Sequence, residues 1–182
     1  MSVKETFLTA SLMTKLALII ISVSNFLNWI AFTTTSWYVT PTKWWGIWRQ
    51  CDFGSCYLLD GVISDWHGTF QAFAILGFMG INIAMVLIIL FLFVNACKSN
   101  GEVKMAAIGI CFVTALCYLI AVIIYGAEKS PTGSVSYSSF YSLGYYLGYS
   151  YGLAIVAFIL EAVTGVLLLL DGKALSVTTS PA

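Results

Sequence analysis

The chain has 182 residues, of which 60% are hydrophobic and only 9% are charged, and its formal net charge at pH 7 is zero. An ordinary soluble domain carries roughly 25% charged residues, and a soluble chain of this length could not hide so much apolar surface. This composition excludes an ordinary soluble domain and indicates a protein whose solvent is the lipid bilayer. Because no basic run could neutralise phosphate groups, nucleic acid is not expected as a partner.

Four long apolar segments predict four transmembrane helices, at about 12–32, 70–94, 105–125 and 145–170. Each reaches or approaches the ~20 residues that a helix needs to cross ~30 Å of hydrocarbon. The first segment ends in Trp29-Ile30-Ala31-Phe32 without a small-residue cleavage site, so we interpret it as an uncleaved span and not as a signal peptide. Residues 1–182 are expected to form a single four-span membrane domain.

An even number of spans places both termini on the same side of the membrane, and the basic residues indicate which side. Five lysines lie on short segments that flank the spans: Lys4, Lys15, Lys98, Lys104 and Lys173. The longer loops carry Lys43, Arg49 and Lys129. The positive-inside rule then places both termini, the loop 95–104 and the tail 171–182 in the cytoplasm. The loops 33–69 and 126–144 are predicted to be extracellular, which fits a multi-pass protein of the plasma membrane.

The first outer loop has a composition typical of β-strands. Residues 37–57 are rich in aromatic and β-branched side chains, and Pro41 and Gly54 interrupt the run, which favours a hairpin over a helix. Cys51 and Cys56 enclose only four residues, and a tight turn there would bring their Cα atoms within the ~5.5–6 Å that suits a disulfide. Disulfides persist outside the cell, so this pairing agrees with the predicted orientation.

Trp37, Gly46-Ile47-Trp48, Cys51 and Cys56 form the pattern W…G-[LI]-W-x2-C…C. This pattern resembles the first-loop signature of the claudin / peripheral myelin protein / epithelial membrane protein superfamily. The cysteine spacing is most similar to the lens fibre membrane intrinsic protein branch. The resemblance implies an all-α membrane fold, in which a left-handed four-helix transmembrane bundle carries a small extracellular antiparallel β-sheet from loops 1 and 2.

The same resemblance implies a structural or adhesive protein at cell–cell contacts, which would associate with itself in cis, in trans or both as a homo-oligomer. An auxiliary subunit of an ion channel or receptor is the alternative, because such subunits share the superfamily fold. A small transporter would rest on Glu161 alone. The sequence shows no nucleophile–base pair, metal-ligand cluster or phosphate-binding loop, so no enzyme activity, metal or cofactor is expected.

Polar residues within the predicted spans are candidates for contacts between helices. Glu161 is a carboxylic acid within the fourth span, where an isolated charge is costly. Asn25, Asn28 and Asn82 lie in other spans and could bond to it. We favour an interhelical polar clasp over a transport site, since a transporter would carry several such groups and broken helices.

Small residues and one cysteine complete the candidate sites. Gly144, Gly148 and Gly152 recur at every fourth position, a spacing at which helices approach closely. They would serve packing within the bundle or, alternatively, a dimer contact. Cys97 follows the second span among cytoplasmic lysines and is a candidate for palmitoylation, with a free thiol as the alternative.

Overall fold

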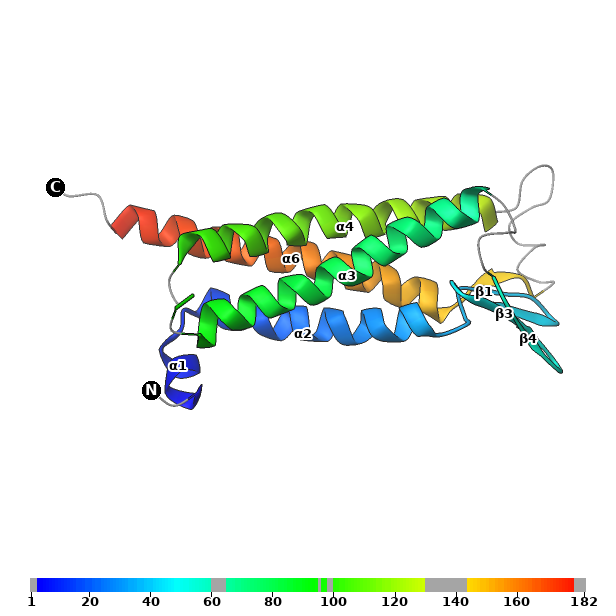
Figure 1. Cartoon of the computed structure of the whole chain (residues 1–182), viewed down its shortest axis with the longest axis horizontal. Coiled ribbons are helices and arrows are strands. Elements are labelled where there is room, and N and C mark those ends of the chain that lie inside the picture. The colour runs from blue at the N-terminus through cyan, green and yellow to red at the C-terminus, as the bar shows by residue number, and fades with distance from the viewer. Residues whose placement is uncertain (1–2, 60–64, 95, 98–99, 130–143, 179–182) are drawn as a thin grey trace.

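The computed structural model describes residues 3–59, 65–94, 96–97, 100–129 and 144–178, and it shows a long helical bundle with a small sheet at one end (Figure 1). Four long helices form the bundle: α2 (Leu12–Thr33), α3 (Asp65–Phe93), α4 (Gly101–Lys129) and α6 (Tyr149–Thr178). The short helix α1 (Val3–Thr9) lies at the end of the bundle where α6 finishes, which we call the terminal end. Each long helix contains a stretch that is long and apolar enough to cross a membrane.

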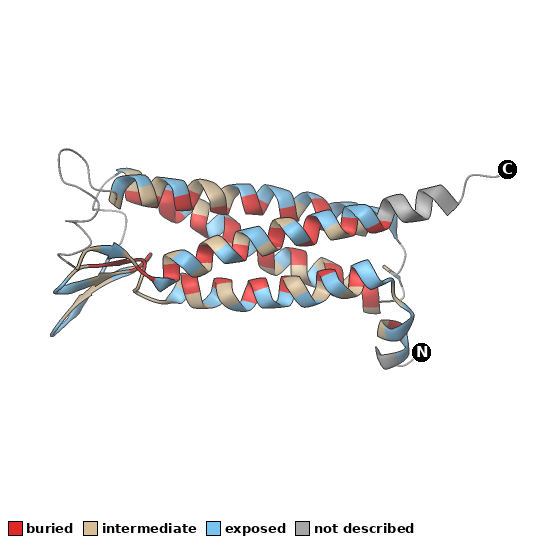
Figure 2. Ribbon diagram, turned by 180° about the vertical axis from the view of Figure 1, so that it is seen from behind, coloured by how far each residue is buried: buried red, intermediate tan, exposed pale blue. Residues whose placement is uncertain are grey.

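Each long helix buries one stripe of its surface and exposes much of the rest (Figure 2). In α2 the buried positions Ala17, Ile21, Ser24 and Asn28 recur at helical spacing. The exposed positions of the bundle are also apolar, for example Ile19, Val23, Phe26, Ile83, Val113, Leu116, Ile159 and Val163. Such a surface would be unfavourable in water and suits lipid, where a helix satisfies its own backbone hydrogen bonds.

Glycines let α3 lie close to α4. A Cβ atom at Gly77 would overlap the ring of Tyr118, and one at Gly80 would overlap the side chain of Thr114. The Thr114 hydroxyl in turn donates a hydrogen bond to the carboxyl group of Glu161 on α6. Because α2 packs against α3 and α6, and α4 packs against the same two helices, α2 faces α4 across the bundle.

Polar contacts join three helices at the terminal end. Ser11 caps α2 by accepting a hydrogen bond from the Thr14 N–H group at 3.2 Å. The Thr14 hydroxyl donates to the carboxylate of Asp171 on α6 at 3.2 Å, and Lys104 of α4 forms an ion pair with the same carboxylate. This carboxylate therefore connects α2, α4 and α6 where they leave the predicted membrane region.

Five short strands form one antiparallel sheet at the opposite end, which we call the sheet end, in the order β4-β3-β2-β1-β5. Four of them lie between α2 and α3: β1 (Tyr38–Val39), β2 (Lys43–Trp45), β3 (Arg49–Asp52) and β4 (Cys56–Leu58). The fifth, β5 (Tyr146–Leu147), directly precedes α6. Tyr38 lies opposite both Trp45 and Leu147, so β1 joins the two chain segments. The predicted fold class, a four-helix bundle with a sheet from both outer loops, is confirmed.

The helix ends differ from the predicted ranges. α3 begins at Asp65 and not near 70, and α4 continues to Lys129 beyond 125, because an acidic first turn and a basic last turn favour these helix ends although they lower hydropathy. Tyr146–Leu147 form a strand where the fourth span was expected to have begun, since pairing with β1 suits aromatic residues. At the terminal end α6 runs to Thr178, into the predicted tail. Most of the predicted loop 126–144 lies outside the described residues.

Replacing Gly80 by valine tests the close contact between α3 and α4. The new side chain would force Thr114 to move, so we expect Gly80→Val to lower the free energy of unfolding by about 2 kcal/mol, as overpacking in a tight core does. Thermal unfolding in detergent micelles, followed by circular dichroism, measures the effect. Gly109→Val is the matched control, because a Cβ atom at Gly109 meets no atom within 4 Å. Equal losses in both variants would contradict the prediction.

Candidate functional site at the sheet end

Trp37 joins the sheet to the bundle. Its side chain is fully buried, and its indole N–H group donates to the carbonyl of Ala31 near the end of α2 at 2.7 Å. Its backbone N–H group donates to the carbonyl of Trp45 at 2.8 Å, and its own carbonyl accepts from the N–H group of Gly148 at 2.9 Å. The indole ring meets three rings from α3, α4 and α6 edge-on: Phe70, Tyr125 and Tyr151. One side chain thus fixes the position of β1 on all four long helices.

The Gly46-Ile47-Trp48 segment holds the sheet against α3. Ile47 is fully buried, and its carbonyl accepts a hydrogen bond from Nε2 of Gln71 at 2.9 Å and lies 3.2 Å from Nε2 of His67. Gln71 also donates to the carbonyl of Leu59 at 3.0 Å. A Cβ atom at Gly46 would lie 2.9 Å from a backbone carbonyl oxygen just after α2, so only glycine fits there without a shift. The signature residues are therefore attachment points of the sheet.

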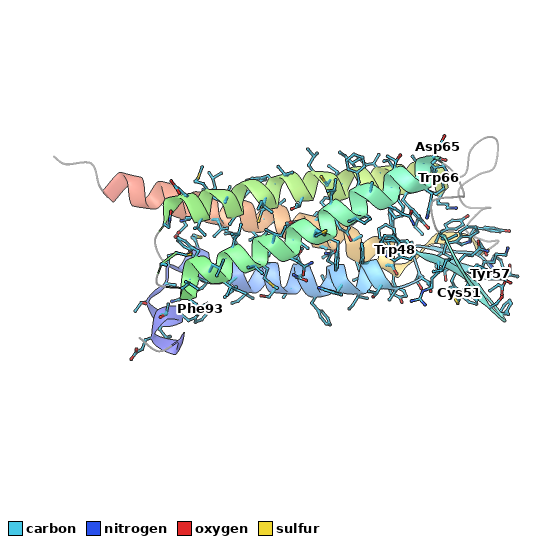
Figure 3. The ribbon with its side chains drawn as sticks, in the orientation of Figure 1. Trp48, Cys51, Tyr57, Asp65, Trp66 and Phe93 are labelled. Carbon is cyan, nitrogen blue, oxygen red and sulfur yellow. A yellow bond between two sulfur atoms is a disulfide. The ribbon has the colours of Figure 1, made fainter. Side chains whose placement is uncertain are left out.

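The third residue of this segment packs on the membrane-spanning helices. The ring of Trp48 lies edge-on to Phe32 of α2, with 5.3 Å between the ring centroids. Phe32 in turn stacks on Phe78 of α3 at 4.0 Å, and Trp29 meets the same ring edge-on. Figure 3 shows Trp48 at the base of the sheet beside the helix ends. Aromatic side chains thus fill the gap between α2 and α3 below the sheet.

The hairpin of β3 and β4 is closed in two ways. The Cys51–Cys56 disulfide joins directly opposed residues of the two strands, as the sequence predicts. Oδ1 of Asp52 accepts hydrogen bonds from the N–H groups of Gly54 and Ser55, each at 3.2 Å. The hydrogen bond from Gly54, more than any other contact, holds the pKa of the Asp52 carboxyl below its usual range, so the group is ionised at neutral pH. The turn is therefore fixed by covalent and polar bonds.

The turn and the edge strand β4 of this hairpin expose apolar side chains. Phe53 is 78% exposed, Leu58 is 72% exposed and Tyr57 is 60% exposed. Figure 3 shows Tyr57 and Cys51 at the far end of the sheet, away from the helices. β4 is also an edge strand, so one side of its backbone has no neighbouring strand among the described residues. We use the name hairpin tip for Phe53 in the turn together with Tyr57 and Leu58 on β4, and these three residues form the candidate contact surface.

Lys129, the last residue of α4, binds the sheet through three aromatic rings. Its ammonium nitrogen lies 4.4 Å from the ring centroid of Trp45 and 5.3 Å from those of Tyr38 and Trp66. Contacts between a cation and an aromatic face contribute roughly 0.5–1 kcal/mol at exposed sites and more when water is excluded. The three rings come from β1, β2 and α3, so this contact, which we call the lysine cage, ties α4 to the sheet.

The polar residues predicted within the spans do not form one cluster. Glu161 is 1% exposed and accepts its hydrogen bond from Thr114. Asn25 donates to Oδ1 of Asn82 at 3.2 Å, between α2 and α3. Asn28 is fully buried, and its amide group has no hydrogen-bond partner among the described residues. The expected bond between an asparagine and Glu161 is therefore replaced by two separate interhelical pairs.

The three glycines before and within α6 have different surroundings. Gly148 lies against the chain after α2, where a Cβ atom would overlap the carbonyl group of Ser36. Gly144 has a φ of +79°, which favours glycine, and leads into β5. Gly152 meets no atom within 4 Å, so a dimer contact at this position stays a prediction. Cys97 is a half-buried free thiol between α3 and α4, and its palmitoylation also stays a prediction.

Three residues that organise this region are not predicted by the sequence. Lys129 falls in the predicted loop 126–144, and Gln71 falls in the predicted span 70–94. Thr114 is one of several hydroxyl residues in the predicted spans. Their roles depend on partners far away in the chain, and only the aromatic residues clustered in the first loop hint at a bound cation. Among the described residues no three His, Cys, Asp or Glu side chains gather as a metal ion would require.

The lysine cage predicts a slow reaction of Lys129 with amine reagents. We expect sulfo-NHS-acetate to acetylate Lys129 about fivefold more slowly than the exposed Lys43, because about 1 kcal/mol of contact with the rings must first be lost. Mass spectrometry of peptides taken at several reaction times gives both rates in one sample. Trp45→Ala removes the nearest ring and should bring the two rates together. Equal rates in the unmodified protein would show that the cage is open.

The sequence matches the model of the PMP-22/EMP/MP20/Claudin family over residues 4–168. No curated protein matches the chain. The family match covers the four helices through most of α6 and the whole sheet, including Trp37, Gly46-Ile47-Trp48 and both disulfide cysteines. With four candidate spans and this match, the chain is a multi-pass membrane protein that belongs to the PMP-22/EMP/MP20/Claudin family.

Proposed function

We propose that this chain is a non-enzymatic, adhesive protein of the plasma membrane that meets a second copy of itself at cell–cell contacts through the hairpin tip. The exposure of the tip carries the proposal. Phe53, in the turn of the β3–β4 hairpin, is 78% exposed, and Leu58, at the end of the edge strand β4, is 72% exposed. Burial of one such side chain contributes about 1.5–3 kcal/mol, so a partner that covered several of them would be held.

The attachment of the sheet supports a role in binding. Trp37, the carbonyl of Ile47 and the lysine cage fix the sheet to all four long helices. The disulfide and Asp52 fix the hairpin itself. A surface that is already ordered loses little conformational entropy when a partner binds, which raises affinity.

The distribution of charge and cysteine supports an extracellular position for the sheet. Lys15 and Lys104 lie at the terminal end, where the positive-inside rule predicts cytoplasm. The disulfide lies at the sheet end, where an oxidising environment would preserve it. In this orientation the hairpin tip faces the space between cells, and the short cysteine spacing agrees with the resemblance to the lens branch of the family.

Removal of the apolar tip should weaken contact between cells. We expect the double variant Phe53→Ser/Leu58→Ser to lose most of the enrichment at borders between two expressing cells, because the surface that a partner would bury becomes polar. The measurement is fluorescence of a tagged copy in mixed culture, as the ratio between expressing–expressing and expressing–bare borders. Phe53→Tyr is the matched control, since it keeps an aromatic ring, and it should retain the enrichment.

The same culture separates adhesion from the alternative function. Uniform staining of the unmodified protein along all borders would overturn the proposal of adhesion in trans. Copurification of a channel or receptor in a fixed ratio would then support the auxiliary-subunit alternative. Both results use surface-expressed full-length protein, so the comparison needs cell-surface biotinylation to show equal delivery of each variant.

The disulfide is expected to be required for presentation of the tip. Cys51→Ser breaks the bond and leaves Cys56 as an exposed thiol, so we predict loss of surface delivery or of border enrichment. The double variant Cys51→Ser/Cys56→Ser removes the extra thiol and should show the same loss if hairpin geometry is the cause. Normal delivery together with normal enrichment in the double variant would rule out a role for the disulfide in adhesion.

A further inference from the structure

The described part of the bundle contains three buried polar side chains without a hydrogen-bond partner there. Asn28, Tyr118 and Tyr125 are 0%, 2% and 1% exposed. Neither amide atom of Asn28 and neither tyrosine hydroxyl has a hydrogen-bond partner among the described residues. Buried polar groups in proteins are nearly always hydrogen-bonded, because an unpaired group has lost its hydration without compensation. Three such groups in one bundle indicate that something else satisfies them.

The contacts of α2 with α6 give the height of Asn28, by which we mean its position along the axis of the bundle. The Ser24 hydroxyl donates to the carbonyl of Ala157 at 2.6 Å, and the Thr34 hydroxyl lies 2.6 Å from that of Ser150. The two helices are therefore antiparallel neighbours along this stretch. Asn28 lies one turn beyond Ser24, which places it at the height of Ala154.

The contacts of α4 with α6 place the two tyrosines around the same height. Thr114 bonds to Glu161, and the hydroxyl of Tyr151 donates to the carbonyl of Val122 at 3.2 Å. The height of residue 154 therefore falls between Tyr118 and Tyr125. These tyrosines are two turns apart on one face of α4, about 10 Å along the axis. Contacts through α3 place Asn28 at nearly the height of Tyr118, because Trp29 meets Phe78 and Gly77 lies against the ring of Tyr118.

Small side chains surround this stretch on every helix. Four alanines from α2, α3, α4 and α6 are fully buried here: Ala31, Ala74, Ala121 and Ala154. Alanine at these four positions takes up little of the volume between the helices. A buried water molecule needs two to four polar partners, and the three unpaired side chains supply these partners.

We propose that Asn28, Tyr118 and Tyr125 bind water molecules inside the bundle, and that water between Asn28 and Tyr118 bridges α2 to α4. Water fits the donor set because it donates and accepts at once. A metal cation would bond only to oxygen atoms and would leave the Nδ2 donor of Asn28 unpaired. Toward the terminal end, the site ends at the hydrogen-bonded pair of Thr114 and Glu161, one turn of α4 from Tyr118.

The sign of a stability change tests the proposal. If water binds these hydroxyls, Tyr118→Phe and Tyr125→Phe each remove one partner of the water, and the melting temperature should fall by about 2–4 °C. If the interior is dry, each variant removes an unpaired hydroxyl, and the melting temperature should stay the same or rise. Tyr151→Phe calibrates the loss of one direct hydrogen bond, and Tyr149→Phe, at a side chain that is 58% exposed, should have no effect.

A second measurement detects the water directly. Radiolysis of bound water by a synchrotron X-ray pulse produces hydroxyl radicals that oxidise adjacent side chains, even when these are buried. We expect oxidation of Tyr118 in the protein in micelles. The oxidation of Tyr118 should be severalfold slower in Asn28→Leu, because this variant removes a hydrogen-bond partner of the water. When Tyr118→Phe is added to Asn28→Leu, the further drop in melting temperature should be less than half of the drop that Tyr118→Phe causes in the unmodified protein. Unchanged or raised melting temperatures of both Tyr→Phe variants, or no oxidation of Tyr118, would overturn the proposal.

Discussion

The hydrogen bond from the indole of Trp37 to the carbonyl of Ala31 is the contact on which the sheet end depends. The last carbonyls of a helix have no partner within the helix, and near lipid they cannot rely on water. The indole N–H group has the same need when its ring is buried. Each group satisfies the other, so the end of α2 and the start of the sheet are specified together.

The sheet would not hold its place without the bundle. Its strands contain two to four residues each, and such short strands are marginal on their own. Order comes from the helices, through Trp37 directly before β1, through the bond of Gln71 on α3 to the carbonyl of Ile47, and through Lys129 at the end of α4. None of these contacts involves the turn of the β3–β4 hairpin, so the turn projects beyond the anchored part of the sheet. The shape of the candidate contact surface therefore follows from how the other strands are anchored.

Local signals in the sequence explain which parts could be predicted. Hydropathy predicts the four helices, and the β-forming residues with two cysteines around a Gly-containing turn predict the hairpin and its disulfide. The family signature adds the sheet, but it does not say what each residue does. The structure gives those roles: Gly46 permits close approach to the chain after α2, and Trp37 satisfies a helix carbonyl.

The remaining contacts could not be predicted because they depend on pairs of distant residues. β5 is a strand only because β1 pairs with it, and Lys129 belongs to the site only because three rings surround its ammonium group. The partner of Glu161 is a further case. Asparagine is the stronger hydrogen-bonding residue by type, yet Thr114 is the residue that faces Glu161 across the contact of α4 and α6.

In lipid, apolar side chains give little preference for one neighbouring helix over another, because the solvent is equally apolar. Close approach and polar pairing must then decide the arrangement. Gly80 brings α3 against Thr114, and the same threonine reaches Glu161 on α6, so one residue of α4 selects both neighbours. The ion pair of Lys104 and Asp171 repeats this selection at the terminal end. A carboxyl group that would be unfavourable in hydrocarbon alone is retained because it fixes which helices meet, and that arrangement in turn sets where Trp37 and Lys129 place the sheet.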